Sequence, residues 1–245
     1  MTRSTEEVHV AQIIPCTEAE GPGRRFAIWF QGCPFRCPSC CNPEMLPFDG
    51  GVITTIRVIR EQLSQSACDN RLDGISLLGG EPFAHPQSVL EITAIAKELN
   101  LSVMIYTGYT LDELQQQGSA LVEQILQQTD ILVDGRFEQS LPETQRRWIG
   151  STNQQIHFLS DRYSMNDPCW SMPNTMELRL HNGQLTVNGF PVRHLKSFWQ
   201  NPVPSVRKNQ QTAPSGRVAQ SVHSDAGFSE SGDARESGEL PQGSP

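Results

Sequence analysis

Three closely spaced cysteines constrain this chain more than any other feature of its sequence. Cys33, Cys37 and Cys40 form a C-x3-C-x2-C arrangement on a stretch that has the proline and serine residues of a loop. Cysteine thiolates hold iron-sulfur clusters, and a short loop can wrap three of them around one cluster. A cubane of four irons with three protein ligands keeps one iron open to a substrate or cofactor. The spacing therefore predicts a cluster that can bind a further molecule.

Two other uses of these cysteines stay open at this point. A structural zinc site normally takes four protein ligands, often as two separated pairs. Cys41 is the nearest candidate for a fourth ligand, although adjacent cysteines seldom converge on one small ion. An electron-transfer cluster would take its fourth ligand from a distant cysteine, and Cys16, Cys68 and Cys169 have no neighbouring cysteine. We interpret Cys41 as a bystander.

The cysteine count and the charge balance limit where such a protein works. The seven cysteines are odd in number and four of them fall within nine positions, unlike the spread pairs of a secreted disulfide scaffold. The amino-terminal residues lack a secretory pattern, and no apolar run approaches the ~20 residues of a membrane span. The net charge is -8 and the basic residues are scattered. We expect a cytoplasmic protein with no membrane or nucleic-acid partner.

Strand and helix patterns alternate along residues 25–135. Short apolar runs predict buried strands, and apolar residues at helical spacing predict the helices between them. The predicted strands are residues 25–30, 74–78, 101–106 and 131–133; one predicted helix begins at Thr54 or Thr55 and ends near Gln65, and others cover residues 87–99, 110–117 and 119–127. The alternation favours an α/β fold whose parallel sheet binds ligands at the carboxyl ends of its strands.

Residues outside this alternation form a strand candidate, a hairpin and a polar tail. Residues 8–14 predict a weak strand. Two alternating runs, residues 176–180 and 184–187, flank Asn182-Gly183, which is a strong hairpin signal. From residue 202 the chain has too few clustered apolar side chains to offset the entropy of ordering. We expect a core of residues 1–165, a small β-hairpin extension of residues 166–201 and a disordered tail of residues 202–245.

The cysteine triad, the preceding strand and the Gly79–Pro82 turn together resemble the signature of radical S-adenosylmethionine (SAM) enzymes. Further segments resemble the activating proteins of anaerobic ribonucleoside-triphosphate reductase, which are glycyl-radical activases. The segments that carry this resemblance are Glu20–Gly23, Gln31–Cys33, Asn42–Glu44, Tyr106–Thr110, Asp130–Gly135 and Arg147–Gln154. They cover about residues 20–160, in the same order and at compatible spacings.

The resemblance implies an open, partial (βα) barrel of the radical SAM type and a 4Fe-4S cluster held by Cys33, Cys37 and Cys40. It also implies that Gly79, Gly80, Glu81 and Pro82 shape the SAM site, because glycines there allow positive φ and a close backbone approach. The cofactors supply the hard chemistry, so no further catalytic side chain is implied.

Thr107 and Asp134 are further candidates for contacting SAM or a nearby cation, from their positions alone. Each stands at the carboxyl end of a later predicted strand and is followed by a glycine, as the cysteine loop and Gly79-Gly80 stand at the ends of earlier ones. The six histidines show no metal-ligand spacing, and we interpret them as surface or turn residues.

The implied reaction is reductive cleavage of SAM to a 5'-deoxyadenosyl radical, which then takes a hydrogen from a glycine of a partner protein. The partner would be an anaerobic ribonucleotide reductase or another glycyl-radical enzyme, and a flavodoxin or ferredoxin would supply the electron. Two alternatives are a radical SAM enzyme with a different protein, peptide or small-molecule substrate, and a non-catalytic iron-sulfur protein. The extension beyond residue 160 could cover the mouth of the active site or dock a different partner.

Overall fold

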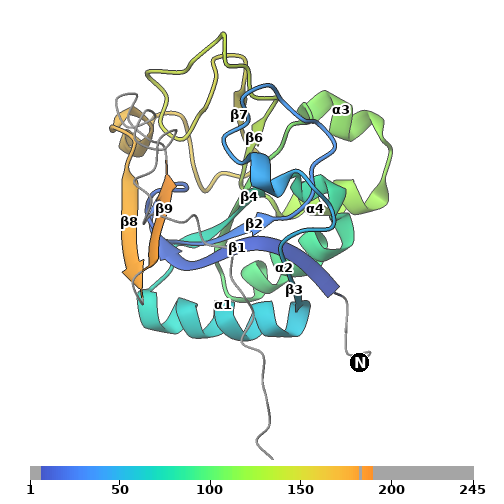
Figure 1. Cartoon of the computed structure of the whole chain (residues 1–245), viewed down its shortest axis with the longest axis vertical. Helices are drawn as coiled ribbons and strands as arrows, with labels where there is room; N and C mark the ends of the chain where they lie inside the picture. The colour runs from blue at the N-terminus through green and yellow to red at the C-terminus, as the bar shows by residue number, and fades with distance from the viewer. Residues whose placement is uncertain (1–6, 182–183, 190–245) are drawn as a thin grey trace, which may run out of the picture. The chain divides into compact units, whose positions relative to one another are not determined.

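The computed structural model describes residues 7–181 and 184–189. Its main sheet is formed by β1 (Glu7–Thr17), β2 (Arg25–Phe30), β3 (Val52–Thr55), β4 (Gly74–Gly79), β5 (Ser102–Tyr106), β6 (Ile131–Asp134) and β7 (Gln155–Phe158). The order across the sheet is β3-β1-β2-β4-β5-β6-β7, and Figure 1 shows how the chain runs through it.

The four central strands are parallel, as the sequence predicts. β2 pairs with β4, β4 with β5 and β5 with β6 in parallel register. β1, β3 and β7 add to this centre in antiparallel register. The sheet ends in the edge strands β3 and β7 and is therefore open. The α/β fold class with an open partial barrel and a small carboxyl-terminal β appendage is confirmed, while β3 and β7 are strands that the sequence analysis did not predict.

Helices cover one face of this sheet. The helices are α1 (Ile56–Asn70), α2 (Pro86–Glu98), α3 (Leu111–Gln116) and α4 (Ala120–Gln128), and the short 3-10 turns are η1 (Pro43–Met45), η2 (Pro82–Ala84) and η3 (Pro168–Ser171). Ile59, Ile92 and Ile125 of α1, α2 and α4 share one buried cluster with Phe26, Ile75 and other strand residues. The helices therefore supply the outer layer of the barrel, as expected of crossover connections.

Local capping explains where α1 begins and ends. The Thr55 hydroxyl accepts a hydrogen bond from the Val58 N–H at 3.3 Å, so the predicted start of this helix is confirmed. The helix continues past the predicted end at Gln65 to Asn70, because Arg71 is the residue that adopts the left-handed conformation that terminates it (φ 50°).

The amino-terminal ends of three parallel strands are tied together by one buried cation, Arg25. Its Nε donates to the Ser76 hydroxyl at 2.7 Å, and its Nη1 donates to the Ser102 hydroxyl and the Pro22 carbonyl, both at 3.0 Å. Because a guanidinium without partners is very costly to bury, these bonds are what allow Arg25 to lie in the sheet. The arrangement holds β2, β4 and β5 together at the end opposite to the cysteine loop.

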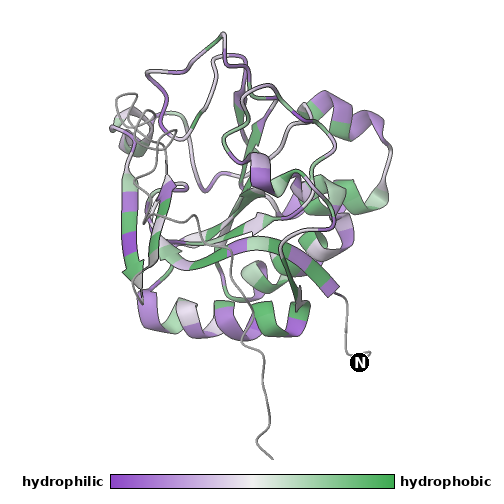
Figure 2. Ribbon diagram, in the orientation of Figure 1, coloured by the Kyte–Doolittle hydropathy of each residue, from purple (hydrophilic) through white to green (hydrophobic). Residues whose placement is uncertain are grey.

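A separate two-stranded sheet, β8 (Met176–His181) and β9 (Gln184–Gly189), forms the predicted hairpin. Hydropathy alternates along β8 (Figure 2). Its apolar side chains face outward, with Leu178 59% and Leu180 75% exposed. Its polar side chains contact the end of β1, where the Glu177 carboxylate accepts from the Glu18 N–H at 2.8 Å.

The hairpin is attached to the end of β1 and to the residues between β1 and β2. Asn188 donates to the Thr17 hydroxyl at 2.8 Å, and the Gly189 N–H donates to the Glu20 carboxylate at 2.6 Å. Thr17 and Glu20 precede β2, whereas the cysteine loop follows it. The described part of the hairpin is therefore attached away from the cysteine loop, and the role of the extension as a whole stays a prediction. The residues 182–183 between the strands and the predicted tail of residues 202–245 lie outside the described residues, and the domain boundaries stay a prediction.

The buried Glu20 carboxyl generates a prediction about pH and stability. Burial is the main reason that its pKa rises to about 8, although hydrogen bonds from Gly189 and Asn188 oppose the rise. The folded carboxyl keeps its proton where the unfolded one releases it, so the stability that this provides is fully present below about pH 4.5. It is lost as the pH rises towards 8. Glu20→Gln should remove this loss, on the order of a few kcal/mol at pH 8.5.

Urea unfolding of wild type and Glu20→Gln at pH 4.5 and pH 8.5 measures the effect. The difference in unfolding free energy between the two proteins should grow with pH in favour of the variant. Glu18→Gln is the matched control, because Glu18 is the exposed carboxylate of the same turn. Equal pH dependence in wild type and Glu20→Gln would contradict the assignment.

Candidate functional site

The cysteine loop follows β2 directly and returns to the sheet at β3. Cys33 is buried, Cys37 and Cys40 are half-buried, and all three are free thiols. The Cys40 N–H donates to the Cys37 carbonyl at 3.1 Å, which closes a turn between the last two cysteines. Arg36 (φ 48°) and Ser39 (φ 58°) both adopt the left-handed conformation, which is uncommon for residues with a side chain. The loop is therefore tightly turned at the positions between its cysteines.

The chemistry of this loop fits a cluster better than a single metal ion. Among the described residues, no three or more His, Cys, Asp or Glu side chains are grouped as ligands of one ion. In a cubane each thiolate binds a different iron, so three ligands need not converge on one point. The Asn42 N–H donates to the Cys40 sulfur at 3.4 Å, and N–H···S bonds of this kind tune clusters. Burial raises the pKa of Cys33 to about 11 and also raises that of Cys40, so binding iron must displace their protons.

Main-chain contacts join the Gly79–Pro82 turn to the start of the cysteine loop. The Gly80 N–H donates to the Phe30 carbonyl at 2.8 Å, and the Glu81 N–H donates to the Gly32 carbonyl at 2.9 Å. A Cβ on Gly80 would lie 2.2 Å from the Gly32 oxygen, and Gly79 has a φ of 106°. The two glycines are therefore required by the approach of one backbone to another, at the point where the predicted cluster and SAM sites meet.

Glu81 connects the turn after β4 with the turn after β5. Its side chain is 1% exposed. One carboxylate oxygen accepts from the Phe83 N–H and the Thr107 hydroxyl, both at 2.9 Å, and the other accepts from the Gly108 N–H at 2.8 Å. Burial raises the pKa of Glu81 to about 7, while these hydrogen bonds oppose the rise. The predicted residues Glu81 and Thr107 are thus in direct contact.

Phe35 packs the middle of the cysteine loop against the turn after β5. Its ring packs edge-on against Tyr109, with centroids 4.6 Å apart, and the Arg136 guanidinium lies 4.6 Å from its centre. A Cβ added to Gly108 would lie 2.5 Å from this ring. Ser39 makes a second link, because its hydroxyl donates to the Gln139 side chain at 2.6 Å. The loop is therefore held from the turns that follow β5 and β6.

Asp134 lies at the end of β6, as predicted, but its carboxylate is used within the protein. It accepts from the Leu111 N–H at 2.7 Å and faces the His157 Nε2 at 2.9 Å. These contacts fix the start of α3 and the edge strand β7. They assign Asp134 a structural role, and whether it also contacts SAM or a cation stays a prediction.

Among the described residues, His9, His157 and His181 lie on strands, whereas His85 lies at the bend before α2, in agreement with the interpretation as a turn residue. His157 lies on β7 and contacts Asp134. His85 is half-buried, with its Nε2 2.8 Å from the Gln31 carbonyl. The Gln31 side chain in turn donates to the Glu44 carbonyl at 3.1 Å and the Pro47 carbonyl at 2.6 Å, which closes the cysteine loop at its base. Such long-range contacts leave no periodic signal in the sequence, so the hydrogen-bond partners of His157 and His85 could not be predicted from it.

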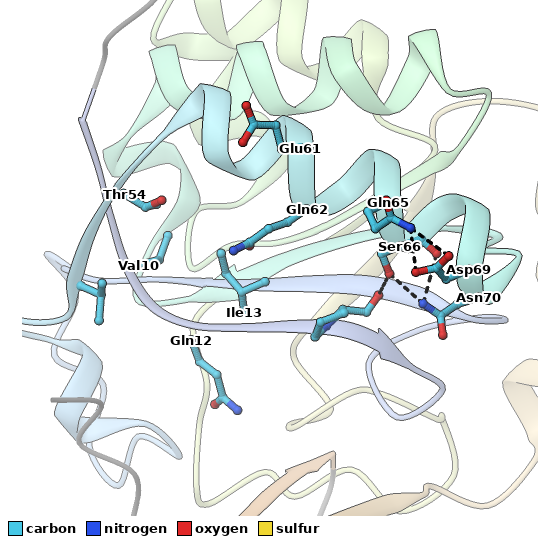
Figure 3. A pocket seen from close by; sticks show the side chains of 12 residues that line it. Val10, Gln12, Ile13, Thr54, Glu61, Gln62, Gln65, Ser66, Asp69 and Asn70 are labelled. Atoms are coloured by element: carbon cyan, nitrogen blue, oxygen red, sulfur yellow. Dashed lines mark hydrogen bonds between the residues drawn. The ribbon is translucent and has the colours of Figure 1, made fainter. Parts of the chain in front are cut away.

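A surface groove of about 730 Å³ lies elsewhere, between β1 and α1 (Figure 3). Its polar side chains bond to one another: Gln65 donates to Asp69 at 2.9 Å, and Asn70 donates to the Ser66 hydroxyl at 3.0 Å. None of the predicted site residues lines it. The groove holds none of the residues that the sequence assigns to the cluster or to SAM, so the strand ends around the cysteine loop are the better candidate.

Comparisons with known proteins identify relatives of the part of the chain that holds this site. The family model described as a 4Fe-4S single cluster domain matches residues 19–157. The anaerobic ribonucleoside-triphosphate reductase-activating protein of Escherichia coli (strain K12) is 34% identical over 155 residues, which cover 60% of this chain and 97% of that protein. The proteins of the same name from Haemophilus influenzae and Enterobacteria phage T4 are 31% and 28% identical over 153 and 164 residues. These cover 60% and 65% of this chain and 95% and 96% of the relatives.

The contact between Phe35 and Gly108 can be tested by substitution. Gly108→Ala places a methyl group against the ring and should displace the loop, at a cost of about 1–3 kcal/mol. Iron bound per chain after anaerobic reconstitution should fall. The double variant Gly108→Ala/Phe35→Leu relieves the clash and should recover iron binding in part. Equal iron content in Gly108→Ala and wild type would show that the loop does not depend on this contact.

The carboxylate of Glu81 generates a second prediction. Glu81→Gln replaces one acceptor oxygen with an NH2 group that must face a donor, so the variant should lose about 1–3 kcal/mol of stability. Chemical denaturation measures this loss. Glu123→Gln, an exposed change on α4, is the matched control and should leave the stability within about 0.5 kcal/mol of wild type. An equally small effect of Glu81→Gln would contradict the proposed acceptor role.

Proposed function

The chain belongs to the family of anaerobic ribonucleoside-triphosphate reductase-activating proteins, which is built on the 4Fe-4S single cluster domain, and we propose that it generates a glycyl radical on a partner reductase. The contact that carries this proposal is the one between the Glu81 N–H and the Gly32 carbonyl at 2.9 Å. It brings the turn that we assign to SAM against the base of the loop that carries the three cysteines.

Each part of the site has a separate task in this proposal. Cys33, Cys37 and Cys40 would hold the cluster, with one iron left for SAM. Gly79, Gly80, Glu81 and Pro82 shape the SAM side, with Thr107 beside Glu81. When bound, the two cofactors supply the reductive cleavage of SAM to methionine and a 5'-deoxyadenosyl radical. The chain itself positions these groups and keeps water away from them.

The partner must present its glycine at the carboxyl ends of the strands, where these residues meet. An extended segment of the partner protein can reach this end of the sheet. The hairpin of β8 and β9 is attached at the other end, beside the start of β2. An electron donor of the flavodoxin or ferredoxin type would approach the cysteine loop, where Pro34, Arg36 and Ser39 are exposed. In the part of the chain that is described, no helix has the length and apolar character of a membrane span.

One observation favours an alternative substrate for the same chemistry. The hairpin lies at residues 176–189, beyond the span of residues 19–157 that the family model matches. A chain with such an addition can serve a different protein, peptide or small molecule. This alternative retains the cluster, SAM and the radical, and changes only the acceptor of the radical.

Anaerobic reconstitution tests the proposal in two stages. With SAM and dithionite, the cluster-loaded protein should form 5'-deoxyadenosine and methionine, and Cys33→Ala, Cys37→Ala or Cys40→Ala should lower this rate at least 100-fold. Cys68→Ala is the matched control, because Cys68 is exposed on α1. A loaded cluster that forms neither product would overturn the enzymatic function.

The second stage identifies the acceptor. Addition of the anaerobic ribonucleotide reductase from the same organism should give the electron paramagnetic resonance (EPR) signal of a glycyl radical on the reductase. SAM cleavage without this signal would favour the alternative substrate.

A further inference from the structure

His85 occupies the junction between the turn after β4 and helix α2. Its N–H donates to the Pro82 carbonyl at 2.9 Å, and its own carbonyl accepts from the Val89 N–H at 3.0 Å. The backbone of His85 is therefore fixed to the segment that we assign to SAM. Its side chain leaves this segment and reaches the cysteine loop.

We propose that His85 is a positioning residue, which sets the distance between the cluster-binding loop and the turn that binds SAM. This inference rests on the function proposed above. The geometry that supports it consists of one directed hydrogen bond and one ring contact.

The hydrogen bond joins the His85 Nε2 to the Gln31 carbonyl oxygen at 2.8 Å. Because a carbonyl oxygen can only accept, the ring must carry a proton on Nε2. The ring also stacks on Phe30, with centroids 5.5 Å apart and planes 16° apart, and lies 6.2 Å from the Phe48 ring. Stacking restricts the orientation of the imidazole, so the proton points in one direction.

Gln31 links the hydrogen bond from His85 to both ends of the cysteine loop. It is 2% exposed and stands two residues before Cys33. Its N–H donates to the His9 carbonyl at 3.0 Å, and its side-chain amide donates to carbonyls of Glu44 and Pro47. A shift of the Gln31 backbone must therefore move both ends of the loop. His85 is the side chain that holds this backbone from the SAM side.

The consequence for function follows from the number of groups that SAM must satisfy at once. Its amino and carboxylate groups would reach the cluster on the cysteine loop, while the rest of the molecule would contact the turn that includes Glu81. The loop and the turn must then be held at one separation, and errors of about 1 Å in such positions can cost on the order of 100-fold in rate. The backbone bonds of Gly80 and Glu81 fix this separation next to the strands. His85 fixes it on the other side of the turn, next to α2.

Two substitutions separate the hydrogen bond from the ring. His85→Phe keeps an aromatic ring against Phe30 but removes the donor. His85→Gln keeps an N–H donor near the position of Nε2 but removes the ring. The measurements are iron content, thermal midpoint, equilibrium SAM binding to the reconstituted protein, and the change that SAM produces in the EPR spectrum of the reduced cluster.

We expect His85→Phe to bind SAM about 10- to 100-fold more weakly and to lose most of the spectral change, as for other residues that orient the ligands of a metal site. His85→Gln should restore both to within a few-fold of wild type. If His85→Phe also loses iron, recovery of iron by His85→Gln supports the role of the donor. Equal SAM binding and spectra in wild type and His85→Phe would overturn the inference. An equal loss in both variants would overturn it as well, because the ring and not the donor would then matter.

The proposed function can fail separately from this inference. If the wild-type protein binds SAM with a spectral change but forms no glycyl radical on the reductase, the choice of partner is wrong, while weaker SAM binding in His85→Phe that His85→Gln restores still supports the role of His85. If wild type cleaves SAM and His85→Phe binds SAM equally well, the function stands and the role of His85 is wrong.

Discussion

The close contact between two stretches of backbone, Gly79–Glu81 and Phe30–Gly32, is the constraint on which the candidate site depends. Two N–H groups of the first stretch donate to two carbonyls of the second, and the Gly32 oxygen occupies the space that a side chain of Gly80 would need. Hydrogen bonds between main-chain groups are short and well directed, so they fix relative positions more closely than contacts between long side chains do. The base of the cysteine loop is therefore held in place by main-chain groups, whatever side chains the rest of the loop carries.

Buried carboxylates also hold neighbouring connections together, at the ends of the strands. Glu81 accepts from groups that follow β4 and β5, and Asp134 accepts from the start of α3. Asp130, which precedes β6, accepts from the Val103 N–H at 2.8 Å and from the Ser160 hydroxyl and Lys97 amine, both at 2.7 Å. Each carboxylate is costly to bury, and each is offset by several donors from neighbouring connections. These carboxylates therefore hold neighbouring connections of the barrel in place.

The sequence predicts the centre of the fold well and its edges poorly. The runs that become β2, β4, β5 and β6 are apolar because both of their faces are buried, and this gives a signal that does not depend on the neighbouring strand. β3 and β7 are four-residue edge strands, and what makes them strands is pairing with β1 and β6. That pairing is a long-range property that local composition does not carry.

The candidate site divides in a similar way. The cysteines, the Gly79–Pro82 turn, Thr107 and Asp134 could be predicted as site residues, from the spacing of the cysteines, from the family resemblance and from the rule that ligands bind at the carboxyl ends of parallel strands. The contacts that hold these segments together could not be predicted, because they join residues far apart in the sequence, from Glu81 with Thr107, 26 positions apart, to Ser39 with Gln139, 100 positions apart. Histidine was the least predictable residue type, since a ring against a distant carbonyl has no pattern in the sequence.

The attachment of the hairpin at Thr17 and Glu20 has a consequence for how such chains diverge. Selection on the added segment and selection on the chemistry act on opposite ends of the same strands, so a new accessory contact can be acquired while the radical-forming end remains unaltered.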